Sequence, residues 1–376
     1  MIDPASGTHA PRDVGVRGGR VAAIEASLDA ARAGRVIDAR GLLVTAGLVD
    51  LHVHVFAGEE PNHFLAHGHL AVRADDVAPS ACTTTVVDAG SSGSKSFALF
   101  RETAVAPSKT RVLAWLNIVG EGMRGGRFEQ DLGDMDEAAA VATIRENPRV
   151  IVGLKVAHYA GPGWEPIDRA VRAARATGTR VMIDFGGHTP PLPLDELLLR
   201  RLGPGDMLTH AFAEVPGRTA IVDAAGALRP YVVEARARGV RFDVGYGGKS
   251  FSFRQAAAAG RAGFWPDTAS TDAHRASVRG SMHDLPRVLS KLDALGMPLD
   301  EVIRSATVAA ADAIGRADLG RLAVGAEADV ALLELAQGAV TFHDATGAAL
   351  AAKRELRCAL TLRAGEIVFD RDHRAH

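Results

Sequence analysis

Cysteine, aromatic residues and an excess of charge of either sign are all scarce in this chain of 376 residues. It has only two cysteines, Cys82 and Cys358, which excludes a disulfide framework and a thiolate zinc site and favours a reducing, cytoplasmic compartment. Aromatic residues make up 5% of the chain, and the net charge is −2. A nearly neutral chain carries no electrostatic footprint for nucleic acid or anionic lipid. We therefore expect a small-molecule substrate and no nucleic-acid partner.

Long apolar runs are also missing. No uninterrupted run reaches the roughly 20 residues that a membrane helix needs, so we expect no membrane-spanning segment. The first 18 residues lack the charged start and apolar stretch of a signal peptide. The hydrophobic fraction of 47% is nonetheless ordinary for a globular protein and excludes general disorder. The Ala-rich segment 253–263 could pack against the body of the protein or against a second copy, which leaves a homo-oligomer open.

Strand-like apolar runs alternate with helix-like segments through the middle of the chain. The strand-like runs cover residues 47–55, 83–89, 112–118, 150–156, 180–185, 207–210, 240–244 and 268–271. The helix-like segments are 136–146, 166–177, 195–201, 229–238, 253–262 and 285–295. This alternation predicts an α/β protein with a parallel sheet, and eight strands predict a closed (β/α)8 TIM barrel. The alternative, an open doubly wound sheet, normally has a Gly-rich turn after its first strand, and none is present there.

Both ends of the chain have short apolar alternations separated by glycine turns. Residues 14–24 are typical of a hairpin around Gly18 and Gly19, and 36–44 adds another short strand. In the tail, 322–335 and 363–370 are expected to be short strands. The ends are therefore predicted to be β-rich, with the α/β body between them.

Five of the predicted barrel strands end in, or are directly followed by, residues that can bind a metal. These residues are His52, His54, Lys155, His188, His210 and Asp272. In a (β/α)8 barrel the active site lies at the C-terminal ends of the strands, so we expect these side chains to meet at one mouth. Residues two apart on a strand point to the same face, so His52 and His54 offer two imidazoles to one cation. A pair of core histidines with hydrogen-bond partners is the alternative.

Lys155 lies in an otherwise apolar run, where a bare ammonium is costly to bury. Three interpretations compete: a lysine that reaches the surface, a Schiff-base nucleophile of a lyase, and a lysine carbamylated by CO2. We favour the carbamate because neutral imidazoles alone would leave the charge of two metal ions uncompensated. Asp272 supplies a second negative charge and can both ligate a metal and accept a proton from water. Its alternative role is to cap the following helix.

These residues resemble the metal-binding residues of the amidohydrolase superfamily, a group of barrel hydrolases. The matching text is Thr45-Ala-Gly-Leu-Val-Asp-Leu-His-Val-His54, Lys155, His188, His210 and Ser270-Thr-Asp272. The resemblance implies two divalent ions. Nitrogen and oxygen ligands without thiolate allow zinc, manganese or iron, and availability favours zinc. It also implies a metal-bridging hydroxide as the nucleophile.

The resemblance further assigns a role to each residue. His52 and His54 bind the more buried ion, and His188 and His210 bind the outer one. Carbamylated Lys155 bridges the two ions. Asp272 is both a ligand and the catalytic base.

The terminal segments look like the small β-sandwich that members of this superfamily build from both ends of the chain. The matching segments are 16–24 and 319–329. We therefore expect residues 1–46 and 317–376 to form a small β-sandwich domain and residues 47–316 to form the barrel. Family members usually have another strand before a segment like Ile2-Asp-Pro-Ala-Ser-Gly7, so the resemblance implies either a misassigned start codon or a sandwich that lacks this strand.

Segments 116–120, 242–253 and 263–274 look like the amidohydrolase/deacetylase branch, whose members cleave acetyl esters such as acetyl-(R)-mandelate, or N-acyl groups. The implied function is hydrolysis of an acyl ester or amide of a small carboxylate-bearing substrate. A cyclic amide hydrolase of the dihydroorotase or hydantoinase type is the alternative. Dihydroorotases usually have an arginine where this chain has Phe56. A Schiff-base lyase that uses Lys155, or a non-catalytic assembly protein, are hypotheses from other classes.

Substrate-binding candidates lie near the strand ends and in one glycine-rich loop. The strand-end candidates are Asn117, Tyr159, Tyr246, Lys249 and Ser250. The hydroxyls of Tyr159 and Tyr246 could bind a developing oxyanion or a substrate carboxylate. Arg124 and Arg127 could lie on a loop over the mouth. Ordinary loop packing is the alternative for each of them.

Overall fold

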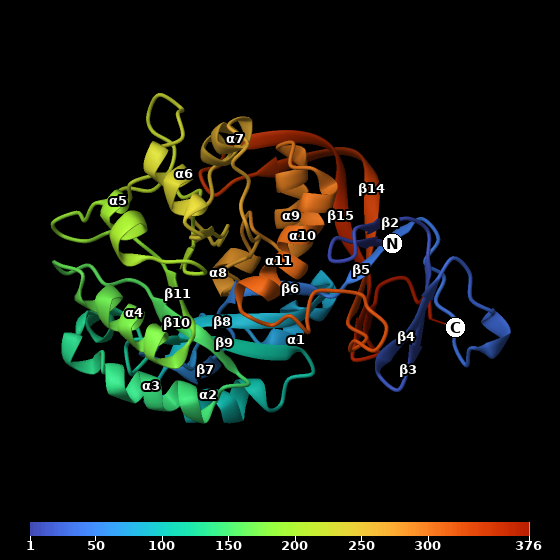
Figure 1. Ribbon diagram of the computed structural model, residues 1–376, viewed down its shortest axis with the longest axis horizontal. Coiled ribbons are helices and arrows are strands. Elements are labelled where there is room, and N and C mark those ends of the chain that lie inside the picture. Colours follow the sequence, from blue (N-terminus) through green and yellow to red (C-terminus); the bar gives the residue numbers. More distant parts are fainter. Residues whose placement is uncertain (376) are drawn as a thin grey trace.

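The computed structural model describes residues 1–375, and Figure 1 shows a barrel body with a group of terminal strands beside it. Seven parallel strands form one sheet in the order β13-β12-β11-β10-β9-β8-β6. They are β6 (Leu48–Val53), β8 (Thr83–Gly93), β9 (Arg111–Asn117), β10 (Ile151–Val156), β11 (Arg180–Ile183), β12 (Met207–Leu208) and β13 (Arg241–Phe242). The short strand β7 (Ala57–Glu60) lies in the loop after β6.

The sheet closes on itself through an eighth extended segment, residues 268–273. Parallel bridges join Thr268 of this segment to Asp243 and Ala273 to Val53. The segment therefore lies between the last strand of the sheet and the first. The predicted TIM-type barrel of the α/β class is confirmed by this closure and by the strand order.

Helices follow the strands and cover the outside of the barrel. They are α1 (Ala74–Val77), α2 (Phe97–Phe100), α3 (Glu137–Glu146), α4 (Glu165–Thr177), α5 (Leu194–Glu196), α6 (Pro230–Ala237), α7 (Phe253–Arg261), α8 (Arg275–Val278), α9 (Leu285–Ala294), α10 (Leu299–Ser305) and α11 (Val308–Ala313). Five of the six predicted helices coincide with these within one residue or so at each end. The sixth, expected at 195–201, is split into α5 and a π-helical turn over Leu197–Arg201.

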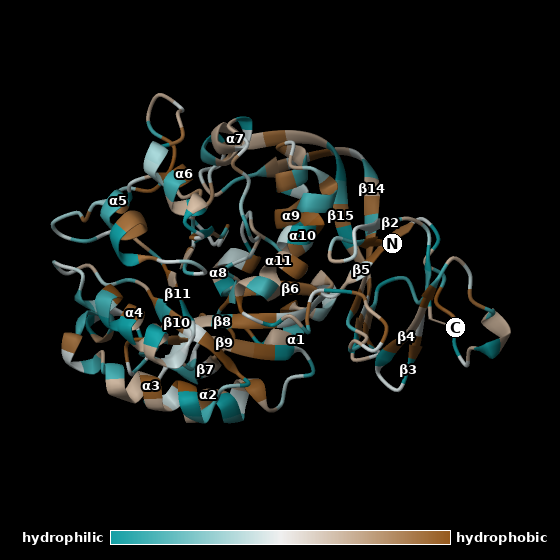
Figure 2. Ribbon diagram, in the orientation of Figure 1, coloured by the Kyte–Doolittle hydropathy of each residue, from teal (hydrophilic) through white to brown (hydrophobic). Residues whose placement is uncertain are grey.

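The barrel interior is apolar at its base. Trp115 is fully buried there, and its indole N–H donates to the carbonyl of Leu51 over 3.1 Å. Strands β6, β8 and β10 are buried along their whole length, as expected for parallel strands with both faces covered. Figure 2 shows the same pattern, with hydrophobic colour concentrated on the strands around β8.

The terminal strands form a separate antiparallel sheet in the order β16-β15-β14-β5. Its members are β5 (Leu42–Ala46), β14 (Val330–His343), β15 (Ala349–Arg363) and β16 (Glu366–Asp370). Two small hairpins accompany it, formed by β1 (Ile2–Asp3) with β2 (Thr8–His9) and by β3 (Asp13–Arg17) with β4 (Arg20–Glu25). Both ends of the chain thus contribute strands, as expected.

The expectation of short strands in the tail is wrong for 322–335, because β14 and β15 form a long hairpin of 14 and 15 residues. The hairpin extends because it packs on the barrel helix α9 as well as on β5. Arg354 pairs with Asp293 of α9 over 2.7 Å, and the hydroxyl of Ser290 accepts from the backbone of Leu356 over 2.8 Å. Since the hairpin contacts both parts, the division into 1–46 with 317–376 and 47–316 stays a prediction.

Among residues 1–375, no helix is long and apolar enough to cross a bilayer. Both cysteines are buried and free. Cys82 donates its thiol hydrogen to the carbonyl of Leu332 over 3.3 Å. Each cysteine thus serves in packing between the barrel and the terminal sheet.

Close packing at the base of the barrel can be tested at Gly153 on β10. A Cβ atom there would lie 2.3 Å from the carbonyl oxygen of Arg180 and 2.7 Å from the ring of Trp115. Gly153→Ala should therefore lower the free energy of unfolding by about 1–3 kcal/mol, measured by chemical denaturation. Gly34→Ala is the matched control, because a Cβ at Gly34 meets nothing within 4 Å. Equal denaturation midpoints for the two variants would contradict the packing described.

Candidate active site

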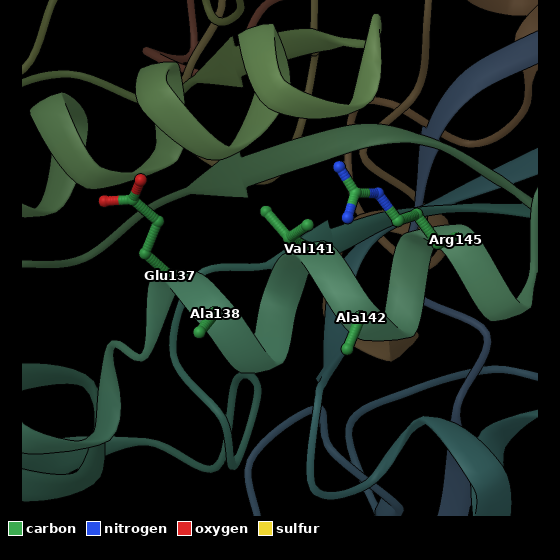
Figure 3. Close-up of a pocket in the computed structure, with 5 residues that line it drawn as sticks. All are labelled: Glu137, Ala138, Val141, Ala142 and Arg145. Atoms are coloured by element: carbon green, nitrogen blue, oxygen red, sulfur yellow. The ribbon is translucent and has the colours of Figure 1, made fainter.

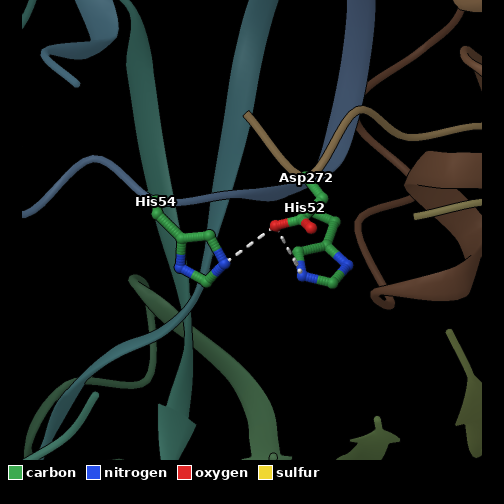
Figure 4. A group of neighbouring side chains, drawn as sticks. All are labelled: His52, His54 and Asp272. Carbon is green, nitrogen blue, oxygen red and sulfur yellow. Dashed lines mark ion pairs between the residues drawn. The ribbon is translucent and has the colours of Figure 1, made fainter. Parts of the chain in front are cut away.

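Two histidines and one aspartate meet at the C-terminal end of the barrel. His52 and His54 come from the end of β6, and Asp272 comes from the eighth segment. One ligand atom from each lies within 4.8 Å of the others (Figure 4). Nε2 of His54 is 3.0 Å from Oδ1 of Asp272, and Nε2 of His52 is 3.5 Å from the same oxygen. Two imidazoles and a carboxylate form a donor set suited to zinc and related divalent ions.

An irregularity in β6 turns the two histidines inward. The pairing of β6 with β8 shifts register between Asp50 and Val53. Before the shift, Val49 belongs to the cluster inside the barrel, whereas after it Val53 belongs to the cluster under the helices. A bulge of this kind moves the following side chains to the other face. His52 and His54 therefore point into the mouth.

Lys155 and His210 complete the group. Lys155 is fully buried on β10, and its Nζ lies 3.2 Å from Nε2 of His52. His210 follows β12, and its ring centroid is 5.0 Å from that of His52. The structure thus brings together five of the six residues predicted as metal ligands. This juxtaposition was expected because all five lie at the C-terminal ends of barrel strands, which meet at one mouth.

His188 stands apart from this group. Its ring lies beside Phe185 and Tyr159, with centroid distances of 5.1 and 6.3 Å. Its Nδ1 is buried and has no hydrogen-bond partner within residues 1–375. Oδ2 of Asp184 lies 3.6 Å from Nε2 of His210. An unpartnered buried ring nitrogen fits a ligand that is completed by an ion.

Hydrogen bonds from neighbouring groups fix which nitrogen of each imidazole carries the proton. Thr209 donates its hydroxyl to Asp243 over 2.8 Å, so its oxygen accepts from Nδ1 of His52 over 2.9 Å. The carbonyl of Gly245 can only accept, so Nδ1 of His210, 2.5 Å away, is the donor. Nε2 of both rings is therefore unprotonated, which is the form that binds metal.

His54 follows the same pattern, with Nδ1 3.0 Å from the hydroxyl of Ser91. Asp50 joins the first strand to the eighth, because it accepts from the hydroxyl and the backbone N–H of Thr271, over 2.5 and 3.0 Å. Sequence reasoning missed this supporting layer of Ser91, Thr209, Asp243 and Asp50. Hydroxyl and carboxyl residues near the strand ends were the available signal.

The local electrostatics favour the metal-binding form of each group. Burial lowers the pKa of Lys155 to about 8, although Asp184 and Asp272 oppose the shift. Burial, together with the charge of Lys155, lowers the pKa of His52 well below its usual value, so the ring is neutral. Burial alone would raise the pKa of Asp272, but its contacts with His52 and His54 outweigh this and hold it well below the ordinary range. Asp272 is therefore a carboxylate.

Two predicted substrate-binding residues use polar atoms in contacts within the protein, and one of the two predictions needs correction. The hydroxyl of Tyr246 accepts from Lys291 over 2.7 Å and donates to the carbonyl of His343 over 3.0 Å. The amide of Asn117 donates to the carbonyl of Gly90 over 2.9 Å and shapes the end of β9. The hydroxyl of Tyr246 has no hydrogen left to donate to a substrate, whereas a substrate contact of Asn117 stays a prediction.

The other candidates lie on the loops around the mouth. Tyr159 is buried beside His188, with its hydroxyl 3.4 Å from the carbonyl of Pro162. Ser250 is partly exposed and Lys249 is exposed. These three remain predictions.

Arg124 and Arg127 lie on the rim. Their guanidinium carbons are 4.1 and 5.1 Å from the ring centroid of Phe128. They help line an open hollow of about 410 Å³ between the loops after β6 and β9. A second hollow, of about 400 Å³, is lined only by residues of α3 (Figure 3). It lies on the helix layer and not at the strand ends, so it is not part of the site.

Comparisons with known proteins agree with this site. A sequence model of the Amidohydrolase family matches residues 252–368. A deacetylase of Agrobacterium fabrum is 34% identical over 337 residues, which cover 88% of this chain and 79% of that protein. A deacetylase of Enterococcus faecalis is 28% identical over 363 residues, 95% of each chain. The crystal structure of a dihydroorotase superimposes with a TM-score of 0.85 at 30% identity, covering 96% of this chain and 95% of that one.

The barrel, the cluster at its mouth and these similarities together define a metal-dependent hydrolase. The chain belongs to the amidohydrolase family. Because the chain belongs to a family of hydrolases, the hypotheses of a lyase and of an assembly protein have no support.

The role of Thr209 in fixing His52 gives a direct test. Thr209→Val removes the hydroxyl that accepts from Nδ1 of His52, so zinc affinity should fall by about 10–100-fold in a chelator competition assay. Thr45→Val is the matched control, because the hydroxyl of Thr45 is buried without a partner among residues 1–375. Its zinc affinity should equal that of the wild type. Equal affinities in both variants would show that the hydrogen bond does not support the ligand.

Proposed function

We propose that this protein is a binuclear metal-dependent hydrolase that removes an acyl group from an ester or amide of a small carboxylate-bearing substrate. The observation that carries the proposal is the cluster of His52, His54 and Asp272, with ligand atoms within 4.8 Å of one another and Lys155 beside it. The relatives named deacetylase support acyl transfer to water as the reaction.

The residues present fit two divalent ions. His52 and His54, with Asp272, would hold one ion, and His210 with His188 would hold the other. The fixed tautomers of His52 and His210 and the unpartnered nitrogen of His188 favour this assignment. Zinc suits the nitrogen and oxygen donors. Ions in such a site lower the pKa of water toward 7 and polarise a carbonyl group.

Lys155 is suited to become the bridging anion. Its neutral amine would attack the carbon of CO2, a C–N bond would form, and one N–H proton would leave to solvent. The side chain thereby changes from a buried cation to an anion. Burial that lowers the pKa to about 8 increases the fraction of neutral amine near neutral pH. The cost of burying the ammonium thus favours the modification.

Asp272 is placed to handle the proton of the reaction. Its Oδ1 faces Nε2 of both His52 and His54, and its low pKa keeps it ionised. It can accept a proton from the attacking water and deliver it to the departing oxygen or nitrogen. Its left-handed backbone, with φ of +52°, is accommodated beside Gly247, where a Cβ would lie 2.4 Å from Oδ2.

Hydrolysis of a cyclic amide is the second candidate, favoured by the likeness to the dihydroorotase structure. The position where dihydroorotases usually have an arginine is occupied by Phe56. Its side chain is buried and packs against Phe100 with ring centroids 5.3 Å apart. That position therefore offers no cation to a substrate carboxylate. This favours the acyl ester or amide.

Metal content and Lys155 provide the main test. Purified protein should hold about two metal ions per chain by elemental analysis, and a chelator should abolish hydrolysis of N-acetyl and O-acetyl carboxylic acids. Lys155→Ala should lose metal and activity, with partial rescue by short carboxylic acids. Full activity of the metal-free protein, or two ions in Lys155→Ala, would contradict the proposal.

The carbamate can be observed directly through its pH dependence. In protein treated with a chelator and then with 13C-bicarbonate, the carbamate signal in 13C NMR should be weaker at about pH 6 than at about pH 9. The reason is that protonation of Lys155 removes the nucleophilic amine as the pH falls through about 8. The signal should be absent from Lys155→Ala.

Asp272→Asn tests the proton transfer. The amide cannot accept the proton, so kcat should fall by about 10²–10⁴-fold, while much of the substrate binding remains. Asp136→Asn, at the N-cap of the distant helix α3, should keep the wild-type kcat, because asparagine also caps a helix. Wild-type turnover by metal-loaded Asp272→Asn would show that another group is the base.

A further inference from the structure

We propose that Arg218 binds the carboxylate of the substrate and so positions its acyl group against the metal-binding cluster. The inference rests on the proposed function and names the residue that selects the substrate. No arginine follows the His52 and His54 pair at the position of Phe56. The carboxylate must therefore be recognised from another part of the mouth.

Arg218 lies on the loop after β12, the strand whose end carries His210. Its Nη2 donates to Oδ1 of the buried Asp184. The other oxygen of Asp184 is 3.6 Å from Nε2 of His210 and 3.9 Å from Nε2 of His158. One carboxylate therefore spans the gap between the guanidinium and a proposed metal ligand. Arg218 is a cation within the mouth and not on its rim.

Two glycine-containing loops, with Gly186 and Gly187 in one and Gly217 in the other, pack around Arg218. Gly186 has φ of +130°, and a Cβ there would lie 2.3 Å from Cγ of Arg218. The backbone N–H of Gly187 donates to the carbonyl of Gly217 over 3.0 Å, which ties the loop after β11 to the loop that carries Arg218. Only glycine allows this close approach. The arginine is thus held beside the loop that leads to His188.

The guanidinium retains donors for a second carboxylate. The side chain is 19% exposed, and Asp184 is its one hydrogen-bond partner in the described part of the chain. Among residues 1–375, Nε and Nη1 of Arg218 are not buried without a partner, so these N–H groups are in contact with solvent. Guanidinium has five donors arranged for bidentate binding of carboxylates. Asp184 holds the arginine in place without using all of them.

The spacing restricts the substrate. Because a single carboxylate bridges Arg218 and His210, only a few bonds can separate the substrate carboxylate from the acyl carbonyl. A carboxylic acid acylated at its α or β position fits this separation. A long spacer would place the carbonyl beyond the cluster.

The test compares two probes that differ only in charge. Mandelate and its neutral amide are titrated into zinc-loaded full-length protein, and binding is measured by calorimetry. Arg218→Gln should weaken mandelate by about 10–100-fold, the range for a lost hydrogen bond to a charged group, and should leave the amide unchanged. Arg304→Gln, on the distant helix α10, should bind both probes as the wild type does.

Several outcomes would overturn the proposal. They are equal mandelate affinity in Arg218→Gln and wild type, no preference of the wild type for mandelate over its amide, or a loss found in Arg127→Gln instead. Since Arg218→Gln leaves Asp184 without its counter-ion, the double variant with Asp184→Asn restores the charge balance. It should fold, keep its zinc content and still bind mandelate weakly. Recovery of wild-type affinity in the double variant would contradict the assignment.

Turnover separates this inference from the proposed function. Wild type should hydrolyse both O-acetylmandelate and the methyl ester of O-acetylmandelate. Arg218→Gln should raise the KM for O-acetylmandelate, while its kcat/KM for the methyl ester should stay within about twofold of the wild-type value. If neither ester is cleaved but mandelate binding depends on Arg218, the proposed function fails and the role of Arg218 stands. If wild type and Arg218→Gln cleave both esters equally, the proposed function stands and the role of Arg218 fails.

Discussion

The buried carboxylate of Asp243 holds the open side of this barrel together. It accepts hydrogen bonds from the hydroxyls of Thr209, Thr268 and Ser270, over 2.8, 2.7 and 2.6 Å. Together with Asp243 they span three consecutive strands with short ladders. β12 and β13 have two residues each, and the eighth segment forms isolated bridges instead of a continuous ladder. Burial raises the pKa of Asp243, and the three hydroxyl donors oppose that shift.

The same carboxylate acts on the chemistry through Thr209. Because Thr209 donates to Asp243, it can only accept from His52, and this fixes the nitrogen that His52 offers to a metal. Closure of the barrel and preparation of the ligand thus depend on one buried charge. A fully satisfied buried polar network of this kind makes a site rigid, whereas a partly satisfied one is costly. The unpartnered nitrogen of His188 is the exception, which the proposed second ion would satisfy.

Much of the barrel and of the cluster could be predicted from the sequence, because both depend on local patterns. Apolar runs predict the strands, and a residue that ends such a run must lie at the mouth, which placed Lys155 and His210 correctly. The hairpin of β14 and β15 could not be predicted in this way. Its segment Ala351-Ala-Lys-Arg-Glu-Leu356 has a composition typical of a helix, and its strand conformation comes from contacts with α9.

Residues that act through distant partners were likewise out of reach. Tyr246 follows a predicted strand and was expected at the mouth, yet its ring stacks on Phe251 and its hydroxyl joins Lys291. Arg218 lies in a loop without a pattern, and only the fold brings it to Asp184. Sequence position predicts which strand end a residue occupies. It does not predict the direction of a side chain that leaves a loop.

The bond from Tyr246 to the carbonyl of His343 has a consequence for the order in which the protein matures. Gly245 orients His210 and Gly247 lies against Asp272, so the residue between them anchors both neighbours. All eight barrel strands have been synthesised once residue 273 is made. The hydrogen bond of Tyr246, however, needs the carbonyl of His343 on β14, which is made some seventy residues later. The barrel can therefore begin to close during translation, but its mouth reaches final form only when the chain is nearly finished.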